Sequence, residues 1–182
     1  ANGVAVKDCA GLAWMDGPQY VCNASRPYIE NLDELAFPAW KHVDINDYHD
    51  FGKLFPFLTL LSGRGCRAKC TFCQLPQVMN GHRYRTRSVD NVCDEIEYDK
   101  KLFPNLQEIM FEDDTLTMRS SQDRLVELCE AMIRRNLNIS WSANARVDVN
   151  DLEVLKLMKR SGCRWLCVGF EFGDQQVLNN VK

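Results

Sequence analysis

The feature that most constrains the fold is an alternation of two hydrophobic periods from Phe57 to the end of the chain. Short apolar runs predict strands at 57–62, 106–112, 138–143 and 164–171, and helical spacing of apolar residues predicts helices at 88–102, 120–136 and 151–161. Ser88 is a plausible N-cap, Gly162 stops the third helix, and Asp174 begins a fourth helical pattern. Repeated β-α units favour parallel strands with right-handed crossovers. We therefore expect an α/β fold whose four units form an open sheet or an arc of a barrel.

The first part of the chain has a different pattern. Residues 4–6 and 20–22 are expected to be short extended stretches, because Asp16-Gly17-Pro18 between them is typical of a turn. An irregular, partly acidic segment follows, with too little apolar periodicity for a domain of its own. We predict that residues 1–52 are a hairpin remnant and linker, and that 53–182 form the α/β part.

Composition excludes several classes of protein. The chain of 182 residues suits one domain, and its apolar content excludes a wholly disordered chain. The apolar run at 57–61 is too short to cross a bilayer, no signal peptide opens the chain, and a net charge of −3 gives no general argument for nucleic-acid or membrane binding. An odd count of 9 cysteines without an export signal argues against a disulfide framework. A reduced, cytoplasmic setting is expected.

Three cysteines carry the clearest chemistry. Cys66, Cys70 and Cys73 follow the first predicted strand with spacing C-x3-C-x2-C. Three soft thiolates on one short loop suit an iron–sulfur cluster, and the missing fourth ligand would leave one iron open to a small molecule. One alternative is a zinc knuckle completed by His82 or Cys93. Reduced core cysteines are a second alternative, which the polar residues flanking this loop disfavour.

The loop at 66–73, with the aromatic Phe72 before its last cysteine, resembles the signature of the radical S-adenosylmethionine (radical SAM) superfamily. The resemblance implies a [4Fe–4S] cluster on the three cysteines, with S-adenosylmethionine chelating the fourth iron through its amino and carboxylate groups. It also implies reductive cleavage of that cofactor to a 5′-deoxyadenosyl radical, which abstracts hydrogen from a substrate. The implied fold is a partial six-stranded (β/α) barrel, of which this chain would supply four units.

The same resemblance assigns cofactor-binding residues at the ends of the later strands. Asp114, and next to it Asp113, match the position that holds the methionyl ammonium, although this chain departs from the common Gly-Gly-Glu form. A carboxylate at a strand's C-terminal end suits a cation at a barrel mouth. The alternative is that both aspartates only cap the turn into the next helix.

Two further strand ends complete the predicted site. Ser142, Asn144 and Arg146 match a position that contacts the cofactor's ribose or carboxylate, and the Arg146 guanidinium suits a bidentate carboxylate. A surface arginine is the alternative reading of Arg146. Glu171 lies in a Gly-x-Glu-x-Gly stretch that resembles the ribose-contacting motif of the superfamily, and a buried glutamate needs such a partner.

A basic stretch surrounds the cysteine loop. Residues 64–87 hold six Lys or Arg, one His and no acidic residue, with Tyr84 among them, a pattern also typical of RNA contact. A thiolate-bound cluster is itself anionic, however, and nearby cations reduce the cost of that charge. The superfamily branch that the chain resembles also carries a Gly-x-Arg-x-Arg-x-Arg-Ser element here. No nucleic-acid partner is therefore expected.

The segment at 31–40 narrows the family prediction. It resembles the connection between a cobalamin-binding domain and a radical SAM barrel, and the chain is similar to magnesium-protoporphyrin ester cyclase-like and hopanoid-biosynthesis proteins. This implies a fragment of a cobalamin-linked enzyme that acts on a lipid, tetrapyrrole or natural-product substrate, with an external electron donor of the flavodoxin or ferredoxin type.

Two alternative functions stay open. A tRNA-modifying methylthiotransferase-like enzyme would bring an RNA-binding module and a second cysteine set, and a zinc-binding interaction module would hold zinc without sulfide.

Overall fold

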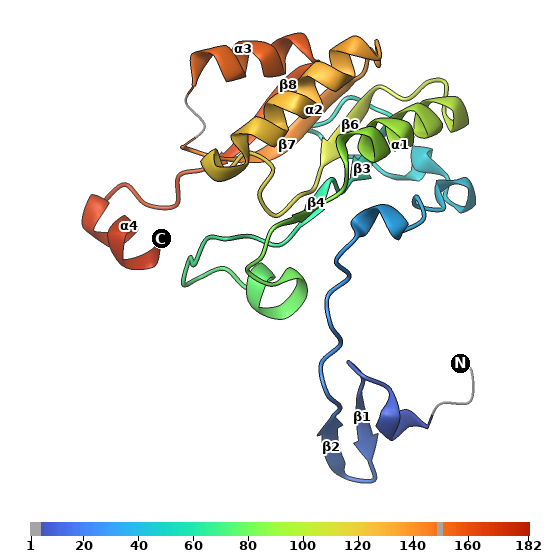
Figure 1. Ribbon diagram of the computed structural model, residues 1–182, viewed down its shortest axis with the longest axis vertical. Helices are drawn as coiled ribbons and strands as arrows, with labels where there is room; N and C mark the ends of the chain where they lie inside the picture. Colours follow the sequence, from blue (N-terminus) through green and yellow to red (C-terminus); the bar gives the residue numbers. More distant parts are fainter. Residues whose placement is uncertain (1–4, 149–150) are drawn as a thin grey trace. The chain divides into compact units, whose positions relative to one another are not determined.

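The computed structural model describes residues 5–148 and 151–182 (Figure 1), and the chain divides into two compact units, Ala1–Glu30 and Asn31–Lys182. We refer to them as the N-terminal unit and the α/β unit. No helix among the described residues is long and apolar enough to span a bilayer.

The N-terminal unit is an antiparallel hairpin of β1 (Ala13–Asp16) and β2 (Gln19–Cys22). The second strand was predicted correctly, but the first was wrong: Val6–Asp8 is a short 3-10 turn, and Val4 lies outside the described residues. A two-residue hairpin turn requires its strands to begin directly beside it, so the turn at Gly17, where φ is +58°, pairs 13–16 with 19–22. The Asn23 side chain then ties the unit together, accepting from Trp14 Nε1 at 3.2 Å and donating to the carbonyl of Val6 at 2.7 Å.

The α/β unit is built on a parallel four-stranded sheet. Its strands are β3 (Phe57–Leu60), β6 (Glu108–Phe111), β7 (Ser140–Arg146) and β8 (Cys163–Gly169), in the spatial order β3-β6-β7-β8. The helices that follow the strands are α1 (Val89–Leu102), α2 (Gln122–Arg134), α3 (Leu152–Arg160) and α4 (Gln175–Val181). The four β-α units were thus predicted correctly (Figure 1).

The element boundaries differ from the predicted ones by a few residues. The strand expected at 138–143 is Ser140–Arg146, because Asn136 and Asn138 have φ of 53° and 44°. That left-handed conformation is incompatible with an extended strand, so pairing starts two residues later. The predicted N-cap at Ser88 is confirmed, since its side chain accepts from the backbone N–H of Asn91 at 3.2 Å.

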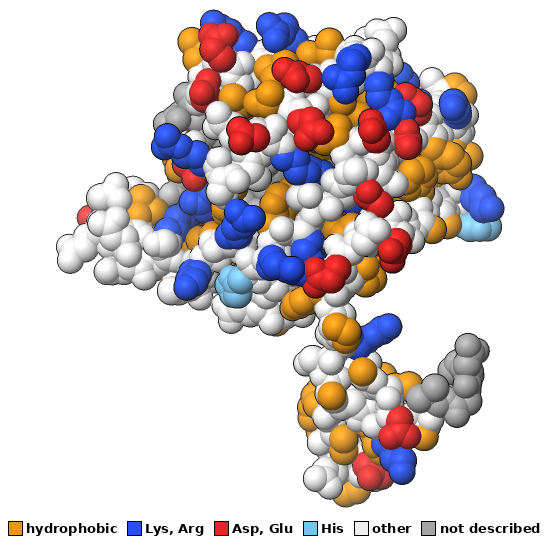
Figure 2. All heavy atoms as spheres, viewed as in Figure 1, with side chains coloured by type: hydrophobic (Ala, Val, Ile, Leu, Met, Phe, Trp, Pro, Cys, Tyr) orange, Lys and Arg blue, Asp and Glu red, His pale blue; other side chains and the backbone are white. Residues whose placement is uncertain are grey.

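The core lies between the sheet and helices α1, α2 and α3. Alternate strand residues face the helices, and those from β6 and β7 include Phe111 and Trp141, whose rings pack edge to face with centroids 5.5 Å apart. The indole N–H of Trp141 donates to Ser161 Oγ at 3.1 Å, so its polar atom is satisfied inside the core. The helices present acidic and basic side chains interspersed on their outer surface (Figure 2).

The other face of the sheet carries a buried carboxylate. Glu108 is wholly buried and accepts hydrogen bonds from the backbone N–H of Leu54 at 2.8 Å and from Arg164 Nε at 2.9 Å. Ser142 Oγ donates to the same carboxylate. Because unpaired buried charges are costly, this network fixes the segment before β3 against the start of the sheet.

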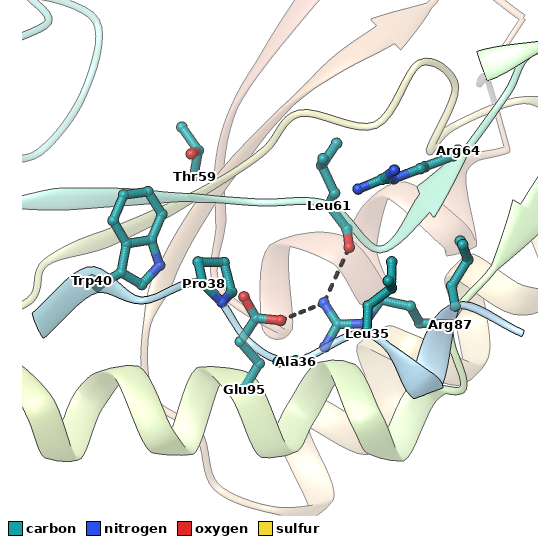
Figure 3. A pocket seen from close by; sticks show the side chains of 10 residues that line it. Leu35, Ala36, Pro38, Trp40, Thr59, Leu61, Arg64, Arg87 and Glu95 are labelled. Carbon is teal, nitrogen blue, oxygen red and sulfur yellow. Dashed lines mark hydrogen bonds and ion pairs between the residues drawn. The ribbon is translucent and has the colours of Figure 1, made fainter. Parts of the chain in front are cut away.

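Residues 31–52 pack along β3 and α1 as part of the α/β unit. They form short 3-10 turns at Leu32–Glu34, Trp40–His42 and Ile45–Asp47. The side chains of Leu32 and Ile45 in these turns are buried. Figure 3 shows this segment lining a pocket in which Arg87 pairs with Glu95 of α1 and donates to the carbonyl of Leu61. The segment thus shields the Arg87–Glu95 ion pair from water beside β3.

Candidate functional site

The cysteine loop is an excursion from a two-stranded stem formed by β4 (Gly63–Arg64) and β5 (Arg85–Thr86). Cys66, Cys70 and Cys73 lie in this excursion as half-buried free thiols. Backbone bonds hold the loop: the N–H of Cys66 donates to the carbonyl of Gly81 at 3.2 Å, and that of Thr71 to the carbonyl of Val181 at 2.9 Å. All three thiols are therefore kept on one surface loop and outside the hydrophobic core.

These thiols line a pocket of about 140 Å³ at the carboxyl ends of the strands. Three other predicted site residues line the same pocket, namely Asp114, Arg146 and Glu171, and they are joined by Phe72, Gly169 and Lys182. The structure thus brings six of the nine predicted site residues together. It does so because parallel strands end at a common edge, where the loops after β3, β6, β7 and β8 meet.

Asp114 anchors the loop as well as lining the pocket. Its Oδ2 accepts from the backbone N–H of Gly65 and from Asn80 Nδ2, both at 2.8 Å. Gly65 has φ of +93°, and a Cβ there would lie 2.3 Å from the carbonyl oxygen of Arg83. Glycine is therefore required directly before Cys66, both for the left-handed backbone and for the close approach of the returning chain.

Charges of both signs line the rest of the pocket. Arg146 Nε lies 3.2 Å from a carboxylate oxygen of Asp148, and Lys182 Nζ lies 3.5 Å from Glu171 Oε1. Glu171 has a positive φ of 65°. Sequence reasoning missed Lys182, since nothing in the pattern of the last helix distinguishes it from an ordinary surface lysine.

Three predicted site residues lie elsewhere. Asp113 is buried and bonded to Ser62 and Tyr84, and Ser142 is buried and bonded to Glu108. Asn144 is exposed on β7 and does not line the pocket. The side chains that hold Asp113 were also missed, because partners 29 and 51 residues away leave no local sequence signal.

Four other cysteines, Cys93, Cys129, Cys163 and Cys167, are expected from the sequence to be packing residues; the first three are buried in the core, but Cys167 is exposed. Burial raises the pKa of the Cys93 and Cys129 thiols to about 11 and that of Cys163 to about 12. Such thiols stay protonated near neutral pH and are poor metal ligands. Cys93 is also 0% exposed within the hydrophobic core, so it is unsuited to completing a zinc site on the surface loop. Over residues 5–148 and 151–182, no three His, Cys, Asp or Glu side chains converge as ligands of a single metal ion.

Comparison with known proteins points to the same part of the chain as the functional site. Residues 60–182 match the family model described as the radical SAM superfamily. The chain is 29% identical over 100% of its length to an uncharacterized methyltransferase of Pyrococcus horikoshii, of which it covers 38%. It is 31% identical over 93% of its length to the anaerobic magnesium-protoporphyrin IX monomethyl ester cyclase of Cereibacter sphaeroides, of which it covers 27%.

The fold also matches a solved structure. The cobalamin-dependent S-adenosylmethionine radical enzyme OxsB, with aqua-cobalamin and S-adenosylmethionine bound, superposes with a TM-score of 0.74 at 21% identity. The match covers 98% of this chain and 26% of OxsB. The chain thus spans well under half the length of the proteins it resembles.

Proposed function

This chain belongs to the radical SAM superfamily of enzymes, and we propose that it carries the cluster and cofactor site of a cobalamin-linked member. Cys66, Cys70 and Cys73 would hold a [4Fe–4S] cluster, whose chemistry when bound is to cleave S-adenosylmethionine reductively so that hydrogen is abstracted from a substrate. An external electron donor of the flavodoxin or ferredoxin type would supply the electron.

The observation that carries the proposal is the shared pocket of the three thiols with Asp114, Arg146 and Glu171. Three thiolates leave one iron of a four-iron cluster without a protein ligand. The residues around them match a zwitterionic amino acid with an attached ribose: Asp114 suits the ammonium, Arg146 the carboxylate and Glu171 the ribose hydroxyls. Asn144 precedes Arg146 by two residues and so shares its face of β7. We therefore keep Asn144 as a candidate for contact with the cofactor at the edge of the pocket.

The relatives support a narrower proposal. One is named a methyltransferase, another a cyclase of a magnesium porphyrin, and the similar structure is named cobalamin-dependent. We infer that the substrate is a lipid, tetrapyrrole or natural product, and that residues 1–52 connect a cobalamin-binding domain to the part at 53–182. The chain covers 38% of the Pyrococcus horikoshii relative, so the proposed enzyme activity is that of a whole protein and not of this chain alone.

Anaerobic reconstitution with iron and sulfide tests the cluster. We expect about four irons and four sulfides per chain, and a reduced-cluster electron paramagnetic resonance (EPR) signal that changes when S-adenosylmethionine is added. Cys70→Ala should lose both, whereas Cys22→Ala, an exposed cysteine of the N-terminal unit, should keep both. One zinc and no sulfide would support the interaction module instead, and a cluster that survives Cys70→Ala would contradict the assignment.

Cofactor binding is tested by a second pair of variants. Arg146→Met should weaken S-adenosylmethionine binding by about 10-fold or more while iron and sulfide content stays unchanged, because the arginine meets the cofactor and not the cluster. Arg134→Met, which removes an exposed arginine at the end of α2, is the matched control. Unchanged affinity in Arg146→Met would exclude this residue from the cofactor site.

A further inference from the structure

Asp113 stands out because it is almost completely buried yet lies beside a pocket residue. It is 2% exposed, and its carboxylate accepts three hydrogen bonds. The donors are the backbone N–H of Ser62 at 2.6 Å, Ser62 Oγ at 2.7 Å and the Tyr84 hydroxyl at 3.0 Å. Three donors leave little capacity for a cofactor ammonium on the same carboxylate.

The partners of Asp113 belong to the stem that carries the cysteine loop. Ser62 directly precedes β4, and Tyr84 directly precedes β5. The stem is closed by the backbone N–H of Arg87, which donates to the carbonyl of Ser62 at 2.9 Å. Gly63 lets the Tyr84 ring lie across the strand, since a Cβ at Gly63 would come within 2.6 Å of the ring.

A guanidinium from α2 completes the network. Arg124 Nη2 donates to the carbonyl of Ser62 at 3.0 Å and to that of Arg87 at 2.9 Å, and Nη1 donates to Ser62 Oγ at 3.2 Å. Arg124 therefore bridges Ser62 and Arg87, the residues that flank the two strands of the stem, and supplies positive charge near Asp113. Burial raises the pKa of the Asp113 carboxyl, and the hydrogen bonds and Arg124 oppose that shift.

Asp113 and Asp114 hold two different parts of one loop. Asp113 holds the stem through Ser62 and Tyr84, whereas Asp114 holds the segment next to Cys66 through Gly65 and Asn80. Two anchors from successive residues that follow β6 fix both the position and the tilt of the loop relative to the sheet. Buried polar groups of this kind are often kept because they specify one arrangement.

We propose that Asp113 is a positioning residue for the cysteine loop and not a ligand of S-adenosylmethionine: through Ser62 and Tyr84 it sets where the three thiols lie relative to the cofactor pocket. This inference rests on the proposed cluster at Cys66, Cys70 and Cys73. It separates the roles of two adjacent aspartates, of which only Asp114 lines the pocket.

The test compares Asp113→Asn, Tyr84→Phe and the double variant with wild type and Glu130→Gln, an exposed carboxylate of α2, in the reconstituted protein. The first readout is the rate of cluster loss to a chelator, followed by absorbance. The second is the EPR spectrum of the reduced cluster before S-adenosylmethionine is added, and the third is the affinity for that cofactor. Tyr84→Phe removes one hydroxyl and keeps the ring, so it tests the network even where Asp113→Asn folds poorly.

Both single variants should lose the cluster about 10-fold faster than wild type and show an altered cofactor-free spectrum. The double variant should be no worse than the poorer single one, because both act in one network, and cofactor affinity should stay within about 2-fold. Weaker cofactor binding with an unchanged cofactor-free spectrum in Asp113→Asn would overturn the inference, as would a wild-type rate of cluster loss in both single variants. A wild-type protein without a cluster would overturn the proposed function and this inference with it.

Discussion

Replacing Asp99 with asparagine is expected to remove much of a pH dependence that burial builds into the stability of the α/β unit. Asp99 lies on α1 with 0% exposure, and neither of its carboxylate oxygens has a hydrogen-bond partner among the described residues. Burial and then the neighbouring Glu95 raise its pKa from 3.8 to about 7, and Arg87 opposes the shift. The Asp99 carboxyl therefore stays protonated in the folded protein at pH values where it is ionised in the unfolded chain.

The sign and size of the effect follow from that difference. The favourable contribution of protonated Asp99 is fully present below pH 3.8 and is lost as the pH rises towards 7. Each pKa unit corresponds to about 1.4 kcal/mol, so between pH 5 and 8 wild type should lose ~3 kcal/mol relative to Asp99→Asn. Glu95, whose pKa burial also raises, contributes in the same direction and is kept in both proteins, so it largely cancels in the comparison.

Urea unfolding followed by circular dichroism at pH 5, 6, 7 and 8 measures this difference. Asp90→Asn is the matched control, because Asp90 lies on the same helix with an 85% exposed side chain. Its stability should track that of wild type at every pH. Parallel stability curves for Asp99→Asn and wild type would refute the argument that buried Asp99 carries the dependence.

Three further substitutions test the packing that supports the site. Gly65→Ala should lower iron and sulfide content after reconstitution, because the new Cβ would lie 2.3 Å from the Arg83 carbonyl oxygen. Phe111→Ala should reduce the free energy of unfolding by about 4 kcal/mol, whereas the fully exposed Phe51→Ala should change it by less than about 0.5 kcal/mol. Glu108→Gln should cost about 2 kcal/mol in urea unfolding because the buried carboxylate loses its charge-assisted hydrogen bonds to Ser142 and Arg164, and an unchanged midpoint would contradict the role of this carboxylate.

Local patterns predicted most of the fold because strands and helices follow from hydrophobic period. Ser88 and Gly162 were recognised as helix ends from residue type alone, and the structure confirms the cap at Ser88. The errors lie where local conformation overrides the pattern. Asn136 and Asn138 delay β7 through their positive φ, and the turn at Gly17 decides which residues form the first hairpin.

The sequence by itself determined the α/β class, the four β-α units and the loop with Cys66, Cys70 and Cys73, since each depends on spacing along the chain. Only the tertiary structure decided that Asp114 lines the pocket while Asp113 turns into a buried network. The two aspartates follow the end of β6, their side chains bond to different residues, and those partners come from distant segments. Spacing along the chain carries no information about which of two adjacent carboxylates will meet those partners.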